Sequence, residues 1–363
     1  MSREIVLVGG GHAHVEVIRQ FGLKPIAGAE LTVIDPNSRP VYSGMVPGFV
    51  ANQYELHELQ IDLAALCQRV GARFIDSPVT RVLSDAVELR DEATVNFDIA
   101  SLDIGSTVSG LDKLGVKEFT LPSRPISALV FGIEELLANG KTGLPFYVIG
   151  AGAGGVELAF CVAARLHKWG VRNPHVVLVT SDPVVLLQSP PAVRARVKKA
   201  LGQRDIKVLA NSSIARVHPH AVELASGEQL PSAGALWVTG PAAHPLASAS
   251  GLPIDETGFI RVAPTFQVAH HENLFAVGDC ASLDGMRKAG VYAVRAGPLL
   301  DANLRAHLAG TKLIEYKPQD DFLSLLNLGD GSAIGSKWGL AFEGRAMMWL
   351  KDKIDRSFME KYK

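Results

Sequence analysis

The chain has 363 residues, with 36 Lys and Arg against 37 Asp and Glu, so its formal net charge is -1. This balance excludes the broad basic surface that nucleic-acid-binding proteins carry. Hydrophobic residues make up 47% and charged residues 20%, which is typical of folded rather than disordered chains. At this length we expect two domains.

The sequence also bears on where the protein works. It holds no run of about 18 apolar residues that would span a membrane, and we expect no signal peptide because the chain enters directly into a strand. Three cysteines, Cys67, Cys161 and Cys280, are too few for a disulfide framework and fit a reducing compartment. We therefore expect a cytoplasmic protein.

The start of the chain predicts a βαβ unit. An apolar run at residues 5–8 is typical of a buried parallel strand, and the loop Gly9-Gly10-Gly11 leads from it into a predicted helix. In such a loop Gly9 makes the tight turn, and Gly11 lets the backbone approach a pyrophosphate. Asp35 ends the next strand, where an acid can accept hydrogen bonds from a ribose hydroxyl pair.

Two histidines follow the first glycine loop. His14 stands where the third glycine of a dinucleotide-binding loop normally lies, so the helix must sit further out or the imidazole must find a pocket. His12 and His14 lie near the predicted pyrophosphate, or they are simply packed side chains. Neither has partners at metal-ligand spacing, so we predict no metal site.

The next segment, residues 40–48, is rich in turn-forming residues, and we expect no regular structure there. Tyr42 and its neighbours add apolar bulk, which favours the wall of a pocket over a plain surface loop. Residues 55–71 predict one helix with an apolar face. A strand over residues 97–104 then ends in a turn at Gly105.

The second βαβ unit has the complete glycine pattern. Gly150, Gly152 and Gly155 have the GxGxxG spacing between an apolar strand and a helix. The following strand ends at Thr180, where an NAD site usually has an acid, and a threonine cannot hold a ribose diol at two points. No arginine stands there to favour a 2′-phosphate, so NADH, NADPH or neither stays open. A later strand ends in a turn at Gly240.

A third stretch returns the chain towards the first unit. The apolar run at residues 272–277 ends in Gly278-Asp279, a tight turn with an acid. Residues 288–297, which include Val291, open a helix whose N-terminal dipole would favour negative charge on a nearby ligand.

The tail from Gly344 onward predicts an amphipathic helix with a basic face and aromatic anchors. This pattern is typical of helices that bind a membrane surface. It is equally typical of a helix that packs on its own domain or on the second subunit of a homodimer.

Together these stretches resemble a two-dinucleotide flavoprotein of the type II NADH:quinone oxidoreductase group over nearly the whole chain. The loop at residues 9–14, the segment Tyr42-Ser43-Gly44-Met45, the stretch at residues 288–292 and the basic tail are most similar to one branch. That branch includes the flavoprotein domain found fused to selenide, water dikinase.

The resemblance implies an α/β fold with two Rossmann-like domains and a small C-terminal segment that ends in the amphipathic helix. The FAD-binding domain would comprise residues 1–112 and 255–320, and the NAD(P)-binding domain residues 113–254. Residues 321–363 would form the C-terminal segment.

The resemblance further implies an enzyme that passes hydride from NAD(P)H to flavin and electrons on to a quinone-like acceptor. Predicted FAD-site residues are Gly9, Gly10, Gly11, His12, His14, Asp35, Tyr42, Val79, Gly105, Gly278, Asp279 and Val291. Predicted nicotinamide-site residues are Gly150, Gly152, Gly155 and Gly240. Glu157 is either placed between flavin and nicotinamide as a catalytic group or is simply a carboxylate favoured by its helix dipole.

A second hypothesis stays open: a flavin-binding partner or redox sensor whose nicotinamide site has decayed, linked to selenium metabolism or to a membrane complex. Thr180 favours this second hypothesis, whereas the complete loop at Gly150 favours the enzyme. In either case the tail could place the protein peripherally on the inner face of the membrane.

Overall fold

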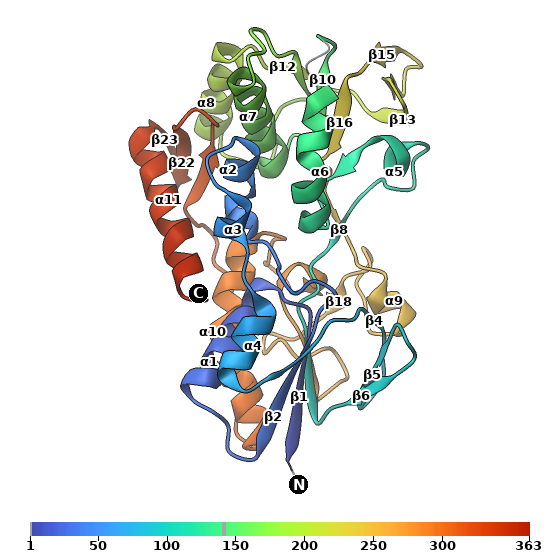
Figure 1. The fold of residues 1–363 in the computed structure, drawn as a ribbon, viewed down its shortest axis with the longest axis vertical. Coiled ribbons are helices and arrows are strands. Elements are labelled where there is room, and N and C mark those ends of the chain that lie inside the picture. Colours follow the sequence, from blue (N-terminus) through green and yellow to red (C-terminus); the bar gives the residue numbers. More distant parts are fainter. Residues whose placement is uncertain (1, 140–142) are drawn as a thin grey trace.

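The computed structural model describes residues 2–139 and 143–363, which form two α/β domains lying end to end (Figure 1). Each domain is built around a five-stranded sheet. All neighbouring strands within these two sheets run parallel. The predicted α/β class with two Rossmann-like domains is therefore confirmed.

The sheet of the first domain has the strand order β19-β7-β1-β2-β3. The strands are β1 (Arg3–Val8), β2 (Ala29–Ile34), β3 (Arg73–Ile75), β7 (Ile99–Leu102) and β19 (Leu274–Ala276). Successive residues of β1 face opposite ways. Ile5 and Leu7 pack in the cluster with helices α1 (His12–Leu23), α4 (Leu63–Val70) and α10 (Gly290–Leu308), whereas Val6 and Val8 pack against a small antiparallel sheet. Because both faces are covered, the strand is apolar from Ile5 to Val8.

The second domain repeats this three-layer design with the strand order β12-β11-β10-β16-β9. The strands are β9 (Leu121–Pro122), β10 (Phe146–Ile149), β11 (Val176–Val179), β12 (Lys207–Leu209) and β16 (Gly234–Trp237). Phe146 and Val148 pack in the cluster with α6 (Ile126–Asn139), α7 (Ala153–Lys168) and α8 (Pro191–Gln203). Tyr147 and Ile149 face the other side, towards β13 (Ile214–His218) and β14 (Ala221–Leu224).

The remaining elements are short. The antiparallel sheets are β4 (Val79–Val82), β5 (Ala86–Leu89) and β6 (Thr94–Asn96); β13, β14 and β15 (Gln229–Pro231); and β21 (Ser324–Asn327), β22 (Ala333–Lys337) and β23 (Leu340–Gly344). The two-stranded pairs are β8 (Thr107–Val108) with β17 (Pro241–Ala242), and β18 (Ile260–Arg261) with β20 (Ala281–Ser282). The short helices are α5 (Val116–Phe119), α9 (Leu246–Ala249) and η3 (Gly278–Cys280).

Two local predictions are wrong. Residues 40–48 contain regular structure, because η1 (Ser43–Met45) leads directly into α2 (Val46–Val50), where Pro47 occupies the first turn that proline tolerates. The helix predicted over residues 55–71 is two helices, α3 (Leu56–Leu59) and α4. The break occurs because Asp62 caps α4 by accepting the Ala65 N–H at 2.9 Å.

The tail helix α11 (Arg345–Glu360) packs on its own chain, on the left of Figure 1 beside the first domain. Its buried side chains include Met348, Lys351, Asp355 and Phe358. Of the predicted alternatives for the tail, intramolecular packing therefore accounts for one face of this helix.

The domain boundaries remain a prediction. The strands of each large sheet lie within the domain expected for them. The antiparallel pair β8–β17 lies where the chain passes between the two sheets, with Thr107 opposite Ala242.

Candidate functional site

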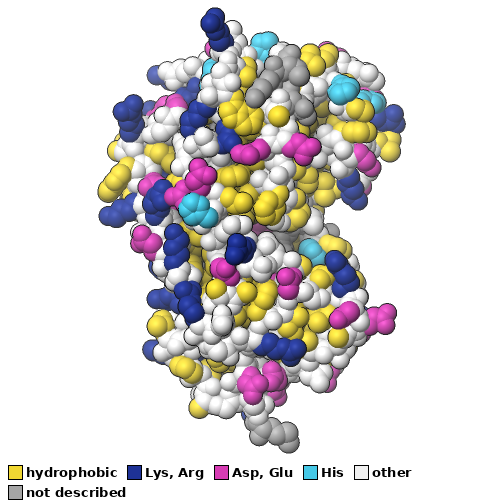
Figure 2. Space-filling model, in the orientation of Figure 1, with side chains coloured by type: hydrophobic (Ala, Val, Ile, Leu, Met, Phe, Trp, Pro, Cys, Tyr) yellow, Lys and Arg dark blue, Asp and Glu magenta, His cyan; other side chains and the backbone are white. Residues whose placement is uncertain are grey.

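Two cavities open where the strands of the two large sheets end, and the surface is hollowed between the two halves of the molecule (Figure 2). The cavity of the first domain has a volume of about 560 Å³, and that of the second about 780 Å³. Ser43, Arg124 and Ile126 line both. A ligand in one cavity can therefore meet a ligand in the other at these residues.

Most residues predicted for the FAD site line the first cavity. They are Gly9, Gly10, Gly11, His12, Asp35, Tyr42, Val79, Gly105 and Asp279. His14, Gly278 and Val291 are not among the lining residues. Gly290, at the start of α10, takes the place at the wall that was predicted for Val291.

Asp35 is held at the end of β2 by two backbone groups. Its Oδ2 accepts the Gly10 N–H at 2.5 Å and its Oδ1 accepts the Asn37 N–H at 2.7 Å. Burial raises the pKa of this carboxyl, although the two N–H groups oppose the rise. The acid thus lies at the cavity wall in the position predicted for a ribose ligand.

Asp103 was not predicted as a site residue, and it lies directly beneath the first glycine loop. It follows β7 and is only 4% exposed. Its Oδ2 accepts the N–H groups of Ala13 at 2.9 Å and of His14 at 3.4 Å, in the first turn of α1. A Cβ added at Gly11 would overlap this carboxyl group. Gly11 therefore makes room for Asp103, in addition to any approach to a pyrophosphate.

Gly278 also leaves space for the carboxyl group of Asp103. Its φ is +68°, and an added Cβ would overlap Oδ1 of Asp103. The Gly-Asp turn was predicted to hold the ligand, but its glycine is explained by Asp103. Burial raises the pKa of Asp103 to about 7, with Asp279 and Asp35 adding to the rise and the Ala13 and His14 N–H groups opposing it.

The imidazole of His14 lies in a pocket inside the protein, which is one of the two alternatives predicted for it. Its Nδ1 lies 2.7 Å from the Gly9 carbonyl and its Nε2 2.8 Å from Ser101 Oγ, on β7. The ring is fully buried, and burial lowers its pKa to about 4. Since both nitrogens bond to the protein, His14 braces the loop and does not face the cavity.

His12 lines the cavity, and its Nε2 is buried without a hydrogen-bond partner within the described part of the chain. Its ring meets Tyr42 edge-on at 5.3 Å and lies 5.7 Å from Phe358 of α11. Tyr42 stacks on Phe358 at 4.3 Å, and its hydroxyl donates to Asp355 Oδ1 at 3.2 Å. The tail helix thus fixes two side chains of the cavity wall.

Asp279 forms an ion pair that sequence reasoning missed. Its Oδ2 lies 2.8 Å from Nη2 of Arg124 and 3.5 Å from Ser106 Oγ. Arg124 also donates to Ser106 Oγ at 2.5 Å. It is the one Lys or Arg among the described residues that line the first cavity. The two partners lie far apart in sequence, so no local pattern could have indicated the pair.

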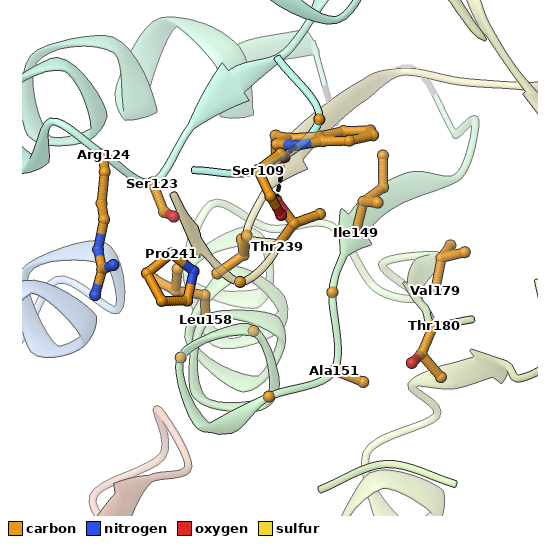
Figure 3. A pocket seen from close by; sticks show the side chains of 18 of the residues that line it. Ser109, Ser123, Arg124, Ile149, Ala151, Leu158, Val179, Thr180, Thr239 and Pro241 are labelled. Carbon is orange, nitrogen blue, oxygen red and sulfur yellow. Dashed lines mark hydrogen bonds between the residues drawn. The ribbon is translucent and has the colours of Figure 1, made fainter. Parts of the chain in front are cut away.

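All predicted nicotinamide-site residues, Gly150, Gly152, Gly155 and Gly240, line the second cavity. Figure 3 shows Arg124 on one side of this cavity and Thr180 on the opposite side, with Ala151 of the glycine loop below. Ser109 lies above, where its carbonyl accepts from Thr239 at 2.6 Å and from Trp237 Nε1 at 2.7 Å.

Thr180 is only 6% exposed, and its hydroxyl accepts the Asp182 N–H at 3.1 Å. The side chain therefore closes a local turn at the end of β11. Ser181, Ser212 and Ser213 line this end of the cavity, together with the exposed Asp182. The residue directly after the strand thus carries a hydroxyl group in place of a carboxylate, and the carboxylate of Asp182 follows two residues later.

Glu157 lines the second cavity from the second turn of α7. Its Oε1 accepts the Asn327 N–H at 2.8 Å. Burial raises the pKa of Glu157 to about 7, although the positive charge of Lys351 and the Asn327 N–H oppose the rise. Lys351 itself pairs with Asp355 at 2.8 Å and donates to the Gly44 carbonyl at 2.6 Å. Charged side chains of the tail helix therefore act on both cavities, Asp355 on Tyr42 in the first and Lys351 on Glu157 in the second.

The residues present fit two dinucleotides. Each cavity has a glycine loop with positive φ at its first glycine, +95° at Gly9 and +115° at Gly150, and each loop opens a helix whose N-terminus favours a phosphate. The unpartnered Nε2 of His12 and the carboxyl of Asp35 provide polar groups that a ligand in the first cavity would satisfy.

The cysteines take no part in either cavity. Cys67, Cys161 and Cys280 are free and buried. Burial raises the pKa of Cys67 and of Cys280 to about 12. Within residues 2–139 and 143–363, no group of three His, Cys, Asp or Glu side chains could hold a metal ion.

A family model described as pyridine nucleotide-disulphide oxidoreductase matches residues 3–297. The demethylphylloquinone reductase NdbB of Synechocystis is 23% identical, over 95% of this chain and 89% of that protein. A sulfide:quinone oxidoreductase from Aquifex aeolicus superposes with a TM-score of 0.85 at 17% identity, covering 99% of this chain and 91% of that one. NDH2 from Plasmodium falciparum, solved in complex with NADH, gives 0.82 at 13% identity, over 100% and 97%.

Proposed function

The chain belongs to the pyridine nucleotide-disulphide oxidoreductase family, and on that premise we propose that it passes electrons from NAD(P)H through FAD to a quinone-like acceptor. Its enzyme class and its cofactors, FAD and NAD(P)H, follow from the family. We assign FAD to the first cavity and NAD(P)H to the second. The observation that carries the proposed electron transfer is the meeting of the two cavities at Ser43, Arg124 and Ile126.

In the first cavity, the loop at Gly9 and the N-terminus of α1 would take the FAD diphosphate. Asp35 would hold the ribose, and Val79 lies where an adenine would rest. Asp279 would hold the sugar-alcohol chain. The start of α10 at Gly290 would direct its dipole at the ring and favour negative charge there.

In the second cavity, the loop at Gly150 and the N-terminus of α7 would take the diphosphate of the nicotinamide nucleotide. The ribose of its adenosine would lie at Thr180, and its nicotinamide at the opposite side, near Arg124. This orientation brings the nicotinamide to the shared residues. The open cavity and the intact loop support a working site rather than a decayed one.

When bound, the flavin supplies the hydride and electron transfer, so the protein has to align the partners and exclude water. Glu157 is the one group we assign near the reacting atoms. Because its pKa is about 7, its carboxyl is near half-protonated at neutral pH and can hold or release a proton. A proton is needed wherever a quinone-like acceptor is reduced.

The acceptor class is proposed from the relatives, since one is named a demethylphylloquinone reductase and one a sulfide:quinone oxidoreductase. A sulfide reaction lacks support in this chain, because its buried thiols line neither cavity. We place the acceptor at the edge of the first cavity beneath α11, where Tyr42 and Phe358 stack.

We further propose that the tail docks the protein on a membrane surface. Within the described residues no helix is long and apolar enough to cross a bilayer. However, the outer side of the C-terminal segment exposes Trp338, Leu340, Phe342, Trp349 and Ile354 at 44–75%. Lys337 lies over the Trp338 ring and Lys353 over the Trp349 ring. Lys and Arg side chains gather on the edge of the molecule where α11 lies (Figure 2). Aromatic anchors beside cations suit an anionic interface.

The function is tested by following NADH and NADPH oxidation with a short-chain quinone as the acceptor. We expect quinone-dependent oxidation of at least one nucleotide. Asp279→Ala should lose bound flavin, whereas Asp284→Ala, an exposed acid a few residues further on, should keep it. Retained flavin with no oxidation of either nucleotide would contradict the proposal and favour a flavin-binding partner or sensor.

Membrane docking is tested separately by co-sedimentation with vesicles that contain anionic lipid. Trp349→Ala should reduce the bound fraction, and high salt should reduce it further. The matched control is Phe131→Ala, because Phe131 is 65% exposed on α6, compared with 63% for Trp349. Equal binding by both variants would refute a role for the tail.

A further inference from the structure

Asp103 occupies a place that the ligand of the first cavity also needs. Its carboxyl accepts the N–H groups of Ala13 and His14, so an acid from the end of β7 already sits at the N-terminus of α1. The same N-terminus is where a diphosphate would bind. Gly11 and Gly278 leave the space that this side chain fills. Asp103 is also one of the residues that line the cavity.

The charges around Asp103 are unbalanced. Asp35 faces it from the end of β2 and Asp279 from η3, whereas Arg124 is the one Lys or Arg lining the described cavity and is already paired with Asp279. Three acids and one base would thus surround a diphosphate that carries negative charge of its own. Like charges that lie close together in a buried site repel strongly.

Three histidines and one cysteine near Asp103 are neutral at physiological pH. Burial lowers the pKa of His12 and of His14 to about 4. Burial likewise lowers the pKa of His244, across the cavity, and raises that of the Cys280 thiol behind Asp103 to about 12. None of these four groups supplies a positive charge to offset the acids. The nearby cation besides Arg124 is Lys288, whose charge acts on Asp279 and Cys280, but it donates to the Ala281 carbonyl and lines the second cavity instead of the first.

We propose that FAD binding is coupled to the uptake of one proton by Asp103, which braces α1 as a neutral carboxylic acid when the diphosphate is in place. This inference rests on the assignment of FAD to the first cavity. Asp103 is a positioning residue, because it acts on the loop and helix that hold the ligand. In its ionised form the acid competes with the diphosphate for the same helix N-terminus.

The direction of the pH dependence follows from the pKa of about 7. Below this value Asp103 is already protonated, and FAD affinity is independent of pH. Above it, each bound FAD must bring in a proton, so affinity falls by up to about tenfold per pH unit. The fall stops once the pH exceeds the still higher pKa of the FAD-bound form.

The test is FAD binding to the apoprotein, followed by flavin fluorescence between pH 6 and pH 8.5. Calorimetry at pH 8 in two buffers of different ionisation enthalpy counts the protons taken up. We expect weaker binding at pH 8 than at pH 7, by up to about fivefold, with an uptake that approaches one proton. Pure structural support by Asp103 would move neither readout.

Two variants assign the proton to this residue. Asp103→Asn should bind FAD with nearly the same affinity at every pH and take up no proton. Asp98→Asn is the matched control, because Asp98 flanks the other end of β7 and also accepts a backbone N–H, that of Glu4 at 2.6 Å. Glu157→Gln should keep the pH dependence, since Glu157 lines the second cavity.

The outcomes separate the inference from the proposed function. Failure of the apoprotein to bind FAD at any pH would overturn the assignment of the first cavity. Tight binding that is independent of pH and takes up no proton would overturn only the role of Asp103. If Asp103→Asn does not fold, the pH series and the proton count on the unaltered chain still decide the question.

Discussion

The two glycine loops have the same backbone path and different supports. Gly9 and Gly150 both have positive φ, and an added Cβ would overlap the carbonyl of Asp103 in the first loop and of Val238 in the second. Asp103 and Val238 therefore occupy equivalent places, each just after the strand beside the loop. One is an acid that bonds to the helix, and the other is an apolar side chain.

The two loops also differ at the position of the third glycine, which is polar in the first loop and a glycine in the second. A Cβ added at Gly155 would overlap the Gly150 carbonyl, so the second helix packs closely on its own loop. In the first loop His14 stands there and bonds to the Gly9 carbonyl with one nitrogen and to Ser101 with the other. A hydrogen-bonded imidazole thus replaces close packing.

One fold thus braces a phosphate loop in two ways. The second loop is held by apolar packing and leaves its helix N-terminus to the ligand. The first is held by the polar group Asp103, His14 and Ser101, so its stability and its ligand affinity depend on protonation. Four substitutions test this difference, and the first should have the strongest effect.

Gly155→Ala should strongly impair use of the nicotinamide nucleotide while the bound flavin remains. The new methyl group would push α7 away from the Gly150 carbonyl. We expect kcat/KM for NAD(P)H to fall about 100-fold, which corresponds to roughly 3 kcal/mol. Gly202→Ala on α8, where a Cβ meets open space, should be neutral. Normal kinetics for Gly155→Ala would refute the role of close packing.

His14→Ala should destabilise the first domain, because it leaves the Gly9 carbonyl and Ser101 without their buried partner. We expect a loss of about 2–3 kcal/mol in urea unfolding, together with weaker flavin retention. The exposed His57→Ala serves as the control. A His14→Ala variant as stable as the control would show that the imidazole does not brace the loop.

Asp103→Asn should stabilise the protein at high pH and not at low pH. The folded pKa of about 7 lies above the ordinary value, so ionisation costs stability as the pH rises from about 4 to about 7. We expect the melting temperature to rise by about 2–4 °C at pH 8 and to be unchanged near pH 4. A gain of equal size at both pH values would contradict the titration of Asp103.

Thr180→Glu should strengthen NADH binding by up to about tenfold, because a carboxylate at the end of β11 can hold a ribose diol. NADPH should gain nothing, since its 2′-phosphate would repel the acid. Thr180→Gln, which adds bulk without charge, is the matched control. An NADH affinity that is unchanged in both variants would mean that the ribose does not lie at this strand end.

The features that could be predicted from the sequence are those that depend on a local pattern of residues. Both loops, Asp35, Asp279 and the turns at Gly105 and Gly240 line the cavities as expected. Their meaning comes from spacing within one strand–loop–helix unit. The amphipathic tail was also predicted, because its periodicity is local.

The missed features depend on contacts between distant segments. Asp103 reaches the N–H groups of α1 only because β7 pairs beside β1. Arg124 meets Asp279 only where the two domains join. The face of α11 that carries Phe358 packs on Tyr42, which likewise depends on the assembled domain, because periodicity alone does not specify a partner.

We propose that electrons pass between two ligands that meet at Ser43, Arg124 and Ile126. The most direct test is to mix the purified yellow protein with NADH, and then with NADPH, in the absence of oxygen while recording its visible absorbance. The account predicts rapid loss of the flavin absorbance with at least one nucleotide. A protein that stays yellow with both would contradict the claim, and a colourless protein that binds no FAD would contradict the assignment of the first cavity.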